Sequence, residues 1–292
     1  MKSLFLFLTA GMIIAAPAAP ADAQEPGDSP PTLLYQSVGQ IAMIHDVEGL
    51  GGPDSVGTFT ISGIPAGGTM EKAWFITGVW DDTTAASNSL HLIFDGADYG
   101  DIPADVVDYA VEDGGLDLGG YAVDVTAGVP GNGSYPFQVT PNQPGSGTSG
   151  ALLAVVYSHA SNPLNEVVMN FGAEGIRHGI STTNFPGLSA GSGSLYIFTE
   201  ADNAFFSDPV ESIALNGSVI LGGPSADIFN ANQGCCASFF DIPVTVVNGL
   251  NTVTIENGQD LFGWHYAALV LEATLPTAVE PASWGKLKAR FQ

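Results

Sequence analysis

The segment from Asp95 to Asp124 holds the densest group of side chains that could do chemistry. It contains nine carboxylates in 30 residues and no Lys or Arg. Glycines between the acids let backbone carbonyls turn inward, and Ca²⁺ takes about six to eight oxygen ligands of these kinds. The spacing is not that of an EF-hand loop, so a solvated acidic loop is the alternative to a calcium site. The candidate metal ligands are Asp105, Asp108, Asp113 and Asp117.

A second motif, 187–191, reads Gly-Leu-Ser-Ala-Gly and fits the nucleophile pattern of serine hydrolases. That chemistry needs a turn from a strand into a helix, which holds the serine exposed beside a histidine and an acid. Here the following residues, Leu195–Thr199, have the composition of a strand, and a matching segment earlier in the chain has Pro65 in place of Ser189. We therefore expect a tight turn between strands and no catalytic residue.

The histidines and tryptophans give weaker signals. The five histidines have no close paired or i, i+4 spacing, so we expect half-buried strand or loop residues. Tryptophans could stack on sugar rings, but Trp74 lies within an apolar run and is expected in the core, whereas Trp80 and Trp264 are weaker core candidates. The histidines are His45, His91, His159, His178 and His265.

The two cysteines, Cys235 and Cys236, are adjacent, so the chain has no long-range disulfide framework. Such a pair can close a strained ring, remain as two thiols or pair between chains. Export favours oxidation, and we expect a vicinal disulfide. Zinc binding is not expected, because two further ligands of the right type are not nearby.

Charge excludes one large class of function. Thirty acidic residues stand against six Lys and Arg, and the formal net charge is −24. Nucleic-acid binding depends on clustered basic residues, so we expect no nucleic-acid partner. A surface of this kind repels acidic polymers and attracts divalent cations.

The N-terminus predicts export. Residues 1–23 combine Lys2, an apolar run and a small-x-small site, Ala21-Asp22-Ala23, as in a secretory signal peptide. The run is too short for a membrane span, and no later stretch is long and apolar enough, so we expect no membrane span in the mature chain. The mature protein is expected to be secreted or held at a bacterial cell surface.

The remaining chain predicts an all-β fold of antiparallel strands. Short runs rich in β-branched and aromatic residues are separated by Gly, Pro, Asn and Asp, and helical periodicity is missing. The clearest runs are Thr58–Ile61, Ala73–Val79, Leu90–Phe94, Tyr121–Val125, Ala151–Tyr157, Glu166–Asn170, Leu195–Thr199, Ser212–Leu215, Val244–Val247, Thr252–Ile255 and Ala267–Leu271.

Five pairs of segments indicate an internal repeat. They recur in the same order, at offsets that drift from 124 to 116 residues, and include the turns Asp95-Gly96 and Asn216-Gly217. We therefore expect two tandem, jelly-roll-like β-sandwiches. The predicted ranges are a signal peptide at 1–23, a leader at 24–32, sandwiches at 33–172 and 173–274, and a C-terminal tail at 275–292.

Several of these segments carry a resemblance to a family. The phrases 62–67, 121–126 (Tyr-Ala-Val-Asp-Val-Thr), 152–157 and 249–253 (Gly-Leu-Asn-Thr-Val) resemble an uncharacterised family of secreted prokaryotic surface proteins with tandem jelly-roll-like sandwiches. The resemblance covers about 220 residues. It implies no known activity or catalytic residue.

The C-terminal segment 279–284 resembles a degenerate PEP-CTERM sorting signal. The Pro that usually precedes Glu280 is absent, and a basic segment, 285–290, replaces the apolar helix. The resemblance implies an association with exopolysaccharide-producing bacteria.

Together these features predict an acidic, non-catalytic surface or extracellular-matrix protein that binds polysaccharide, divalent cations such as calcium, or copies of itself. The alternative is an exported glycan-active enzyme with a pair of carboxylates about 5 to 10 Å apart in a sandwich groove.

The acidic segment yields a test. If it binds Ca²⁺, the cation relieves repulsion among the carboxylates, and stability rises by about 2.7 kcal/mol at a hundredfold excess over Kd. Thermal unfolding in millimolar calcium and in chelator, at constant ionic strength, measures the effect. Equal melting temperatures in calcium and in chelator would show that the acidic segment is a solvated loop and not a calcium site.

Overall fold

The chain folds into antiparallel β-sheets. The computed structural model describes residues 29–53, 55–81, 89–110, 116–143, 145–176, 179–200, 210–233, 236–258 and 262–273. Within these ranges the regular structure is four antiparallel sheets and one short 3₁₀ turn, η2 (Thr126–Gly128). In the same ranges no helix has the length and apolarity needed to cross a membrane.

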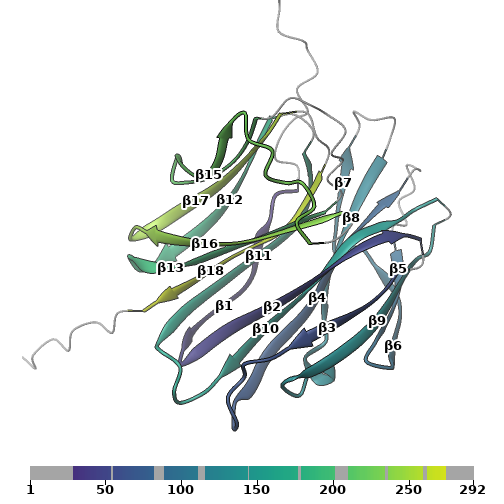
Figure 1. Ribbon diagram of the computed structural model, residues 1–292, viewed down its shortest axis with the longest axis horizontal. Helices are drawn as coiled ribbons and strands as arrows, with labels where there is room; N and C mark the ends of the chain where they lie inside the picture. Colours follow the sequence, from purple (N-terminus) through teal and green to yellow (C-terminus); the bar gives the residue numbers. More distant parts are fainter. Residues whose placement is uncertain are drawn as a thin grey trace, which may run out of the picture.

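The first sandwich contains an inner sheet of five strands and an outer sheet of four (Figure 1). Alternation of buried and exposed residues along the outer strands, as in β5, places Leu90, Leu92 and Phe94 in its core. In spatial order the inner strands are β2 (Ile41–Gly52), β10 (Thr148–Ser158), β4 (Thr69–Asp81), β8 (Leu116–Asp124) and β7 (Val106–Ala110), and the outer strands are β3 (Ser55–Ile61), β9 (Gly133–Pro141), β5 (Ser89–Phe94) and β6 (Ala97–Pro103).

The second sandwich repeats this division, and Phe185, Leu195 and Ile255 lie in its core. Its inner strands are β1 (Thr32–Gly39), β11 (Asn165–Ile176), β18 (Phe262–Glu272), β13 (Gly191–Glu200) and β16 (Ala237–Val246). Its outer strands are β12 (Gly179–Leu188), β17 (Gly249–Asn257), β14 (Val210–Leu215) and β15 (Ser218–Pro224).

Both sandwiches have the strand order of a jelly roll. If β1 and β7 are set aside and the strands of each sandwich are counted along the chain, each inner sheet reads 1-8-3-6 and each outer sheet 2-7-4-5. The predicted all-β fold of tandem, jelly-roll-like sandwiches is confirmed.

The segments paired in the sequence lie on strands that hold equivalent places in the two sandwiches. The pair 73–77 and 195–199 lies on β4 and β13, and the pair 151–155 and 267–271 on β10 and β18. The turns Asp95-Gly96 and Asn216-Gly217 join β5 to β6 and β14 to β15, and both residues of each turn have positive φ. This is the backbone of a type I′ hairpin, which Asp-Gly and Asn-Gly favour.

The strands divide between the sandwiches differently from the predicted ranges 33–172 and 173–274. β1 belongs to the second sandwich, where it pairs with β11 over seven residue pairs from Thr32↔Phe171 to Gly39↔Asn165. β11 itself begins at Asn165. The described part of the chain therefore starts in the second sandwich, crosses to the first at Gln40 and returns between β10 and β11.

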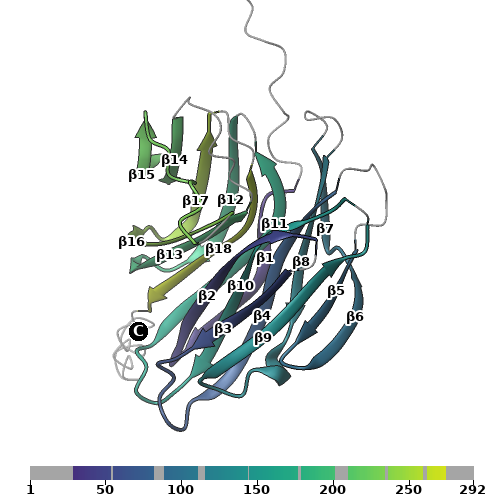
Figure 2. The same ribbon diagram turned by 45° about the vertical axis from the view of Figure 1, so that its right-hand side comes forward.

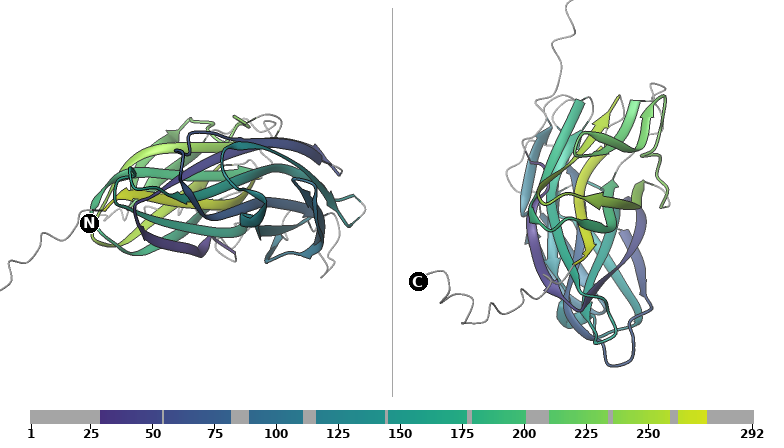
Figure 3. Two further views of the ribbon diagram at one scale, coloured as in Figure 1. Left: turned by 90° about the horizontal axis from the view of Figure 1, so that it is seen from below. Right: turned by 90° about the vertical axis from the view of Figure 1, so that its left-hand side faces the viewer.

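The two inner sheets pack face to face and form a third core between the sandwiches. Ile76 and Leu152 of the first sandwich meet Met169, Phe198 and Ala268 of the second there. The four sheets thus form successive layers, with the outer sheets on opposite sides (Figure 2). Seen from below, the molecule is longer than it is thick (Figure 3).

Close approach of the inner sheets depends on glycine. A Cβ atom on Gly120 would lie 2.8 Å from the Cβ of Ala173 and 2.9 Å from the carbonyl oxygen of Gly172. Both contacts are closer than packed atoms allow, so β8 and β11 can meet here only without a side chain on Gly120.

The middle core predicts that the sandwiches unfold together. Ile76→Ala removes a side chain that is 0% exposed in this core, so we expect a loss of about 2–5 kcal/mol in the free energy of unfolding. Val56→Ala, at a position 70% exposed on β3, is the control and should change it by less than about 0.5 kcal/mol. Urea unfolding followed by circular dichroism measures both. Two separate transitions in the wild-type protein would contradict a shared core.

Candidate functional site

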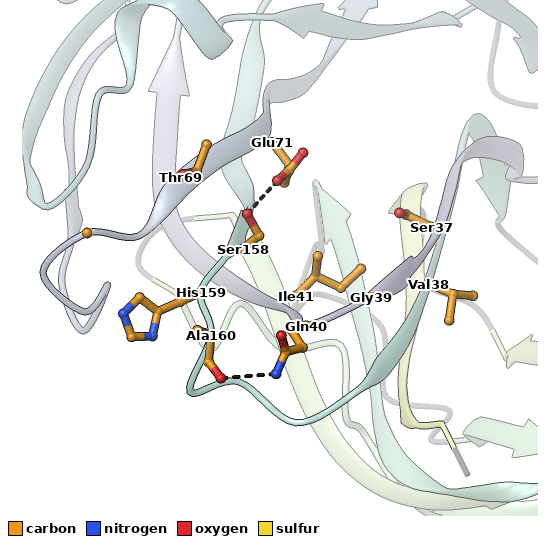
Figure 4. Close-up of a pocket in the computed structure, with 11 residues that line it drawn as sticks. Ser37, Val38, Gly39, Gln40, Ile41, Thr69, Glu71, Ser158, His159 and Ala160 are labelled. Atoms are coloured by element: carbon orange, nitrogen blue, oxygen red, sulfur yellow. Dashed lines mark hydrogen bonds between the residues drawn. The ribbon is translucent and has the colours of Figure 1, made fainter. Parts of the chain in front are cut away.

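A polar pocket lies where the chain crosses between the sandwiches (Figure 4). Its volume is about 490 Å³, and its walls come from the end of β1, the start of β2, the beginning of β4 and the loop after β10. It is therefore lined by both sandwiches. The lining residues are Ser37, Val38, Gly39, Gln40, Ile41, Gly67, Thr69, Glu71, Ser158, His159 and Ala160.

The chain crossings are fixed to each other beside the pocket. The backbone N–H of His159 donates to the carbonyl oxygen of Gln40 at 3.0 Å. The side-chain amide of Gln40 donates to the carbonyl of Ala160, also at 3.0 Å, and the buried Asn165 donates to the carbonyl of Ile41 at 2.7 Å. These bonds hold the floor of the pocket in one geometry.

The pocket contains a serine, a histidine and a glutamate, but not in the arrangement of a nucleophilic triad. The hydroxyl of Ser158 donates directly to Oε1 of Glu71 at 2.5 Å. The Nδ1 atom of His159 instead contacts the Ser161 hydroxyl at 2.6 Å. A catalytic serine needs the histidine as its base, so these contacts do not prepare Ser158 for attack.

The same groups suit recognition of hydroxyl-rich molecules. Glu71 is an exposed carboxylate that accepts hydrogen bonds, and Ser37, Thr69 and Gln40 add hydroxyl and amide groups on the lining. Glycoside hydrolysis uses two facing carboxylates, and Glu71 is the one carboxylate among the residues that line this pocket. The geometry of the pocket therefore favours binding of a hydroxyl-rich molecule over glycoside hydrolysis.

Ser189 of the Gly-x-Ser-x-Gly motif is exposed in the turn between β12 and β13. Its backbone N–H donates to Glu166 at 3.3 Å. A strand follows the motif, so the expected tight turn between strands is confirmed.

The tryptophans occupy different environments. Trp74 and Trp264 are 6% and 0% exposed and lie in cores, as expected for Trp74. Trp264, a weaker candidate, donates its indole N–H to the carbonyl of Tyr266 at 3.1 Å. Trp80 is half-buried.

The candidate calcium ligands do not form a cluster within the described ranges. Asp105 accepts the backbone N–H of Ala122 at 2.8 Å, whereas the buried Asp108 accepts that of Gly175, also at 2.8 Å. Asp117 is buried as well, and Asp113 lies outside the described residues. Among those residues no three acidic, His or Cys side chains are placed to hold a metal, and calcium binding stays a prediction.

Other sequence predictions also lie outside the described residues. They concern the signal peptide, Cys235 of the vicinal pair, His178 and the C-terminal sorting segment. The disulfide between Cys235 and Cys236 stays a prediction.

His45 is enclosed by aromatic rings between the inner sheets. Its ring centroid lies 4.4 Å from that of Tyr196 and 5.2 Å from that of Phe239, and its Nε2 lies 2.8 Å from the Tyr266 hydroxyl. Burial lowers the pKa of His45 to about 3 and raises that of Tyr266 well above its ordinary value. No sequence motif marks His45, because its partners come from β13, β16 and β18.

Comparison with known proteins gives distant structural likenesses. No protein-family model matches the chain, and no curated protein matches it. A conserved protein of unknown function, PA5104 from Pseudomonas aeruginosa PAO1, is 10% identical, with a TM-score of 0.31 over 80% of this chain and 100% of the other.

Two further solved structures are also distantly similar. The ANXUR2 extracellular domain from Arabidopsis thaliana is 9% identical, with a TM-score of 0.31 over 79% of this chain and 84% of the other. The tandem CBM51 modules of a family 98 glycoside hydrolase from Streptococcus pneumoniae are 10% identical, with a TM-score of 0.23 over 78% and 83%. At these scores the likenesses carry no functional argument.

His45 predicts a loss of stability in acid. Its folded pKa of about 3 lies below the ordinary value of 6.5, so its contribution to the free energy of unfolding is full above pH 6.5 and is lost as the pH falls toward 3. The slope is at most about 1.4 kcal/mol per pH unit. His45→Gln, which keeps a hydrogen-bonding group but does not titrate, should reduce this slope in urea unfolding between pH 6.5 and 4.5. An unchanged slope would show that His45 is already charged in the folded protein.

Proposed function

We propose that this protein is an exported, acidic surface or matrix protein that binds glycans in the pocket between its sandwiches. The observation that carries the proposal is the pocket itself, whose lining combines Glu71, Ser37, Thr69 and Gln40 around about 490 Å³. Ligand pockets commonly measure about 300–1,000 Å³. The volume therefore suits one or a few sugar units.

Charge narrows the class of glycan. None of the residues that line the pocket is Lys or Arg, and the whole chain has a formal charge of −24. A uronic acid or sulfated sugar would place its anion beside Glu71 without a cationic partner and against the field of the protein. Neutral and amino sugars avoid this cost, so we expect them to be the ligands.

Export is part of the proposal and rests on the sequence. The signal-like residues 1–23 and the resemblance to secreted surface proteins support a place outside the cell. Calcium could add to stability or to adhesion through the acidic segment from Asp95 to Asp124, as a second binding function. Self-association has less support, because the large apolar side chains exposed in the described ranges are spread over strands as distant as β1, β3 and β15.

Screening of purified protein against immobilised neutral, amino and uronic-acid oligosaccharides tests the proposal. We expect binding to neutral or amino sugars, and Glu71→Ala should weaken it about 10- to 100-fold, as expected for loss of a charged hydrogen-bonding partner. The matched control is Thr58→Ala, in a groove of about 500 Å³ on the outer sheet; it should leave affinity unchanged. If Thr58→Ala abolishes glycan binding and Glu71→Ala does not, the binding site lies in the groove on the outer sheet and not in the pocket. No binding in the whole panel would overturn the proposal.

A further inference from the structure

The two ends of the interface between the sandwiches differ. Both described crossings of the chain, at Gln40 and at 159–164, lie at the pocket end. The opposite end is reached along β10 from Ser158 to Gly150, roughly 27 Å at the usual rise per residue of a strand. Non-covalent contacts hold the inner sheets together there.

At that far end a buried carboxyl group and a buried imidazole face each other. Oε2 of Glu200, on β13, lies 4.0 Å from Nε2 of His265, on β18, and both side chains are 0% exposed. Oε1 of Glu200 accepts the backbone N–H of Gly78 on β4 of the other sandwich at 2.8 Å. Glu200 therefore links the two inner sheets directly.

Irregular backbone and missing side chains make room for this pair. Next to β13, Phe198 pairs with Tyr266 and Thr199 with Trp264, which leaves His265 as the extra residue of a β-bulge. Bulges commonly aim a side chain at a functional position. A Cβ on Gly78 would lie 2.4 Å from Nε2 of His265, so glycine is required opposite the ring.

The contact of the His265 ring with the backbone indicates which ring nitrogen carries hydrogen. Nδ1 of His265 lies 3.3 Å from the carbonyl oxygen of Gly172, which can only accept, so Nδ1 carries hydrogen and Nε2 of a neutral ring has its lone pair toward Glu200. Nε2 of His265 and Oε2 of Glu200 are both buried without a hydrogen-bond partner among the described residues. A proton on Oε2 of Glu200 would supply a donor for this lone pair once the 4.0 Å distance between Oε2 and Nε2 shortens to that of a hydrogen bond.

The geometry points to a hinge and a latch between the two inner sheets. The hydrogen-bonded chain crossings at the pocket form the hinge. The Glu200–His265 pair at the far end is the latch, and loss of its proton lets the two sheets separate there. The pocket lies at the hinge, so opening of the latch changes the angle between its walls. The control of ligand binding by this device rests on the proposed function; the latch itself does not.

The pH range of the latch follows from its two groups. Burial lowers the pKa of His265 to about 4, and stability from that residue is lost as the pH falls from 6.5 toward 4. Burial raises the pKa of Glu200 well above its ordinary value, and stability from that residue is lost as the pH rises above about 4.5. Between about 4.5 and 6.5 the open and closed states each hold one proton, and the two effects cancel. Above 6.5 the open state holds none, so each pH unit favours opening about tenfold.

Other ionisable groups lie on the strands that pack around the pair, and a pH profile of the wild-type protein alone would include them. They include His45, Asp46 and Glu48 on β2, Glu71 and Lys72 on β4, Asp108 on β7, Asp117, Tyr121 and Asp124 on β8, Tyr157 on β10, Glu166 and Glu174 on β11, Tyr196 on β13, Asp241 on β16, and Tyr266 and Glu272 on β18.

Amide hydrogen exchange of the full chain, corrected for the intrinsic rate, tests the latch without any glycan. From pH 6.5 to 8.0, protection of Gly78 should fall about fifteenfold, and between pH 5.5 and 6.5 it should change by less than about twofold. His159, whose N–H donates to Gln40 at the hinge, should keep its protection. Glu200→Gln keeps the shape and the donor toward His265 but cannot ionise, so it should remove the loss at Gly78 while leaving every other titratable group in place.

Three results would overturn the latch: an identical pH profile in Glu200→Gln, equal losses of protection at Gly78 and His159, or a ring-nitrogen spectrum that shows protonated His265 at pH 6. If Glu200→Gln does not fold, two measurements on the wild-type protein test the latch instead. They are the ring-nitrogen spectrum of His265 and the comparison of amide protection at Gly78 with that at His159. A latch that opens as expected in a protein that binds no oligosaccharide would reject the proposed function alone.

Discussion

Face-to-face burial of the two inner sheets is the constraint on which the rest of the structure depends. A jelly roll needs only one buried face on each sheet, yet Ile76, Leu152 and Phe198 lie on the second faces and are 0% exposed. Burial of both faces explains why β10 and β18 are apolar almost throughout. It also makes glycine necessary where backbones approach, as at Gly120. The two sandwiches therefore share the third core between their inner sheets and are not independent domains joined only by a linker.

This packing creates both sites of interest. At one end the chain crossings and strand ends of both sandwiches line a polar pocket that neither sandwich could form alone. At the other end they enclose Glu200 and His265, which water would otherwise solvate. Burying these groups is costly unless each charge or donor finds a partner, and the proton that we propose on Glu200 leaves both groups neutral. The pocket and the buried pair therefore lie at opposite ends of the interface between the same two sandwiches.

Local sequence patterns revealed much of the fold. Alternating residues, as in Leu90–Phe94, and Asp-Gly and Asn-Gly turns identify strands and hairpins, because both depend on neighbours in the chain. The strands before Ser55 were missed. The run from Ile41 to Gly52 includes the polar residues His45, Asp46 and Glu48, which are half-buried on the edge strand β2. The pairing of β1 with β11 joins residues more than 120 positions apart and has no local signal.

The candidate sites depend even more on distant contacts. Glu71 and Ser158 are 87 residues apart, and no motif connects them. Glu200 and His265 looked ordinary in the sequence, because the bulge at His265 and the glycine opposite it exist only once β13, β18 and β4 are assembled. The acidic segment, by contrast, was conspicuous in the sequence, yet the backbone amides of Ala122 and Gly175 engage Asp105 and Asp108. A high density of acidic residues in the sequence shows only where carboxylates are frequent. Whether a carboxylate changes the free energy of folding depends on its burial, which the local sequence does not show.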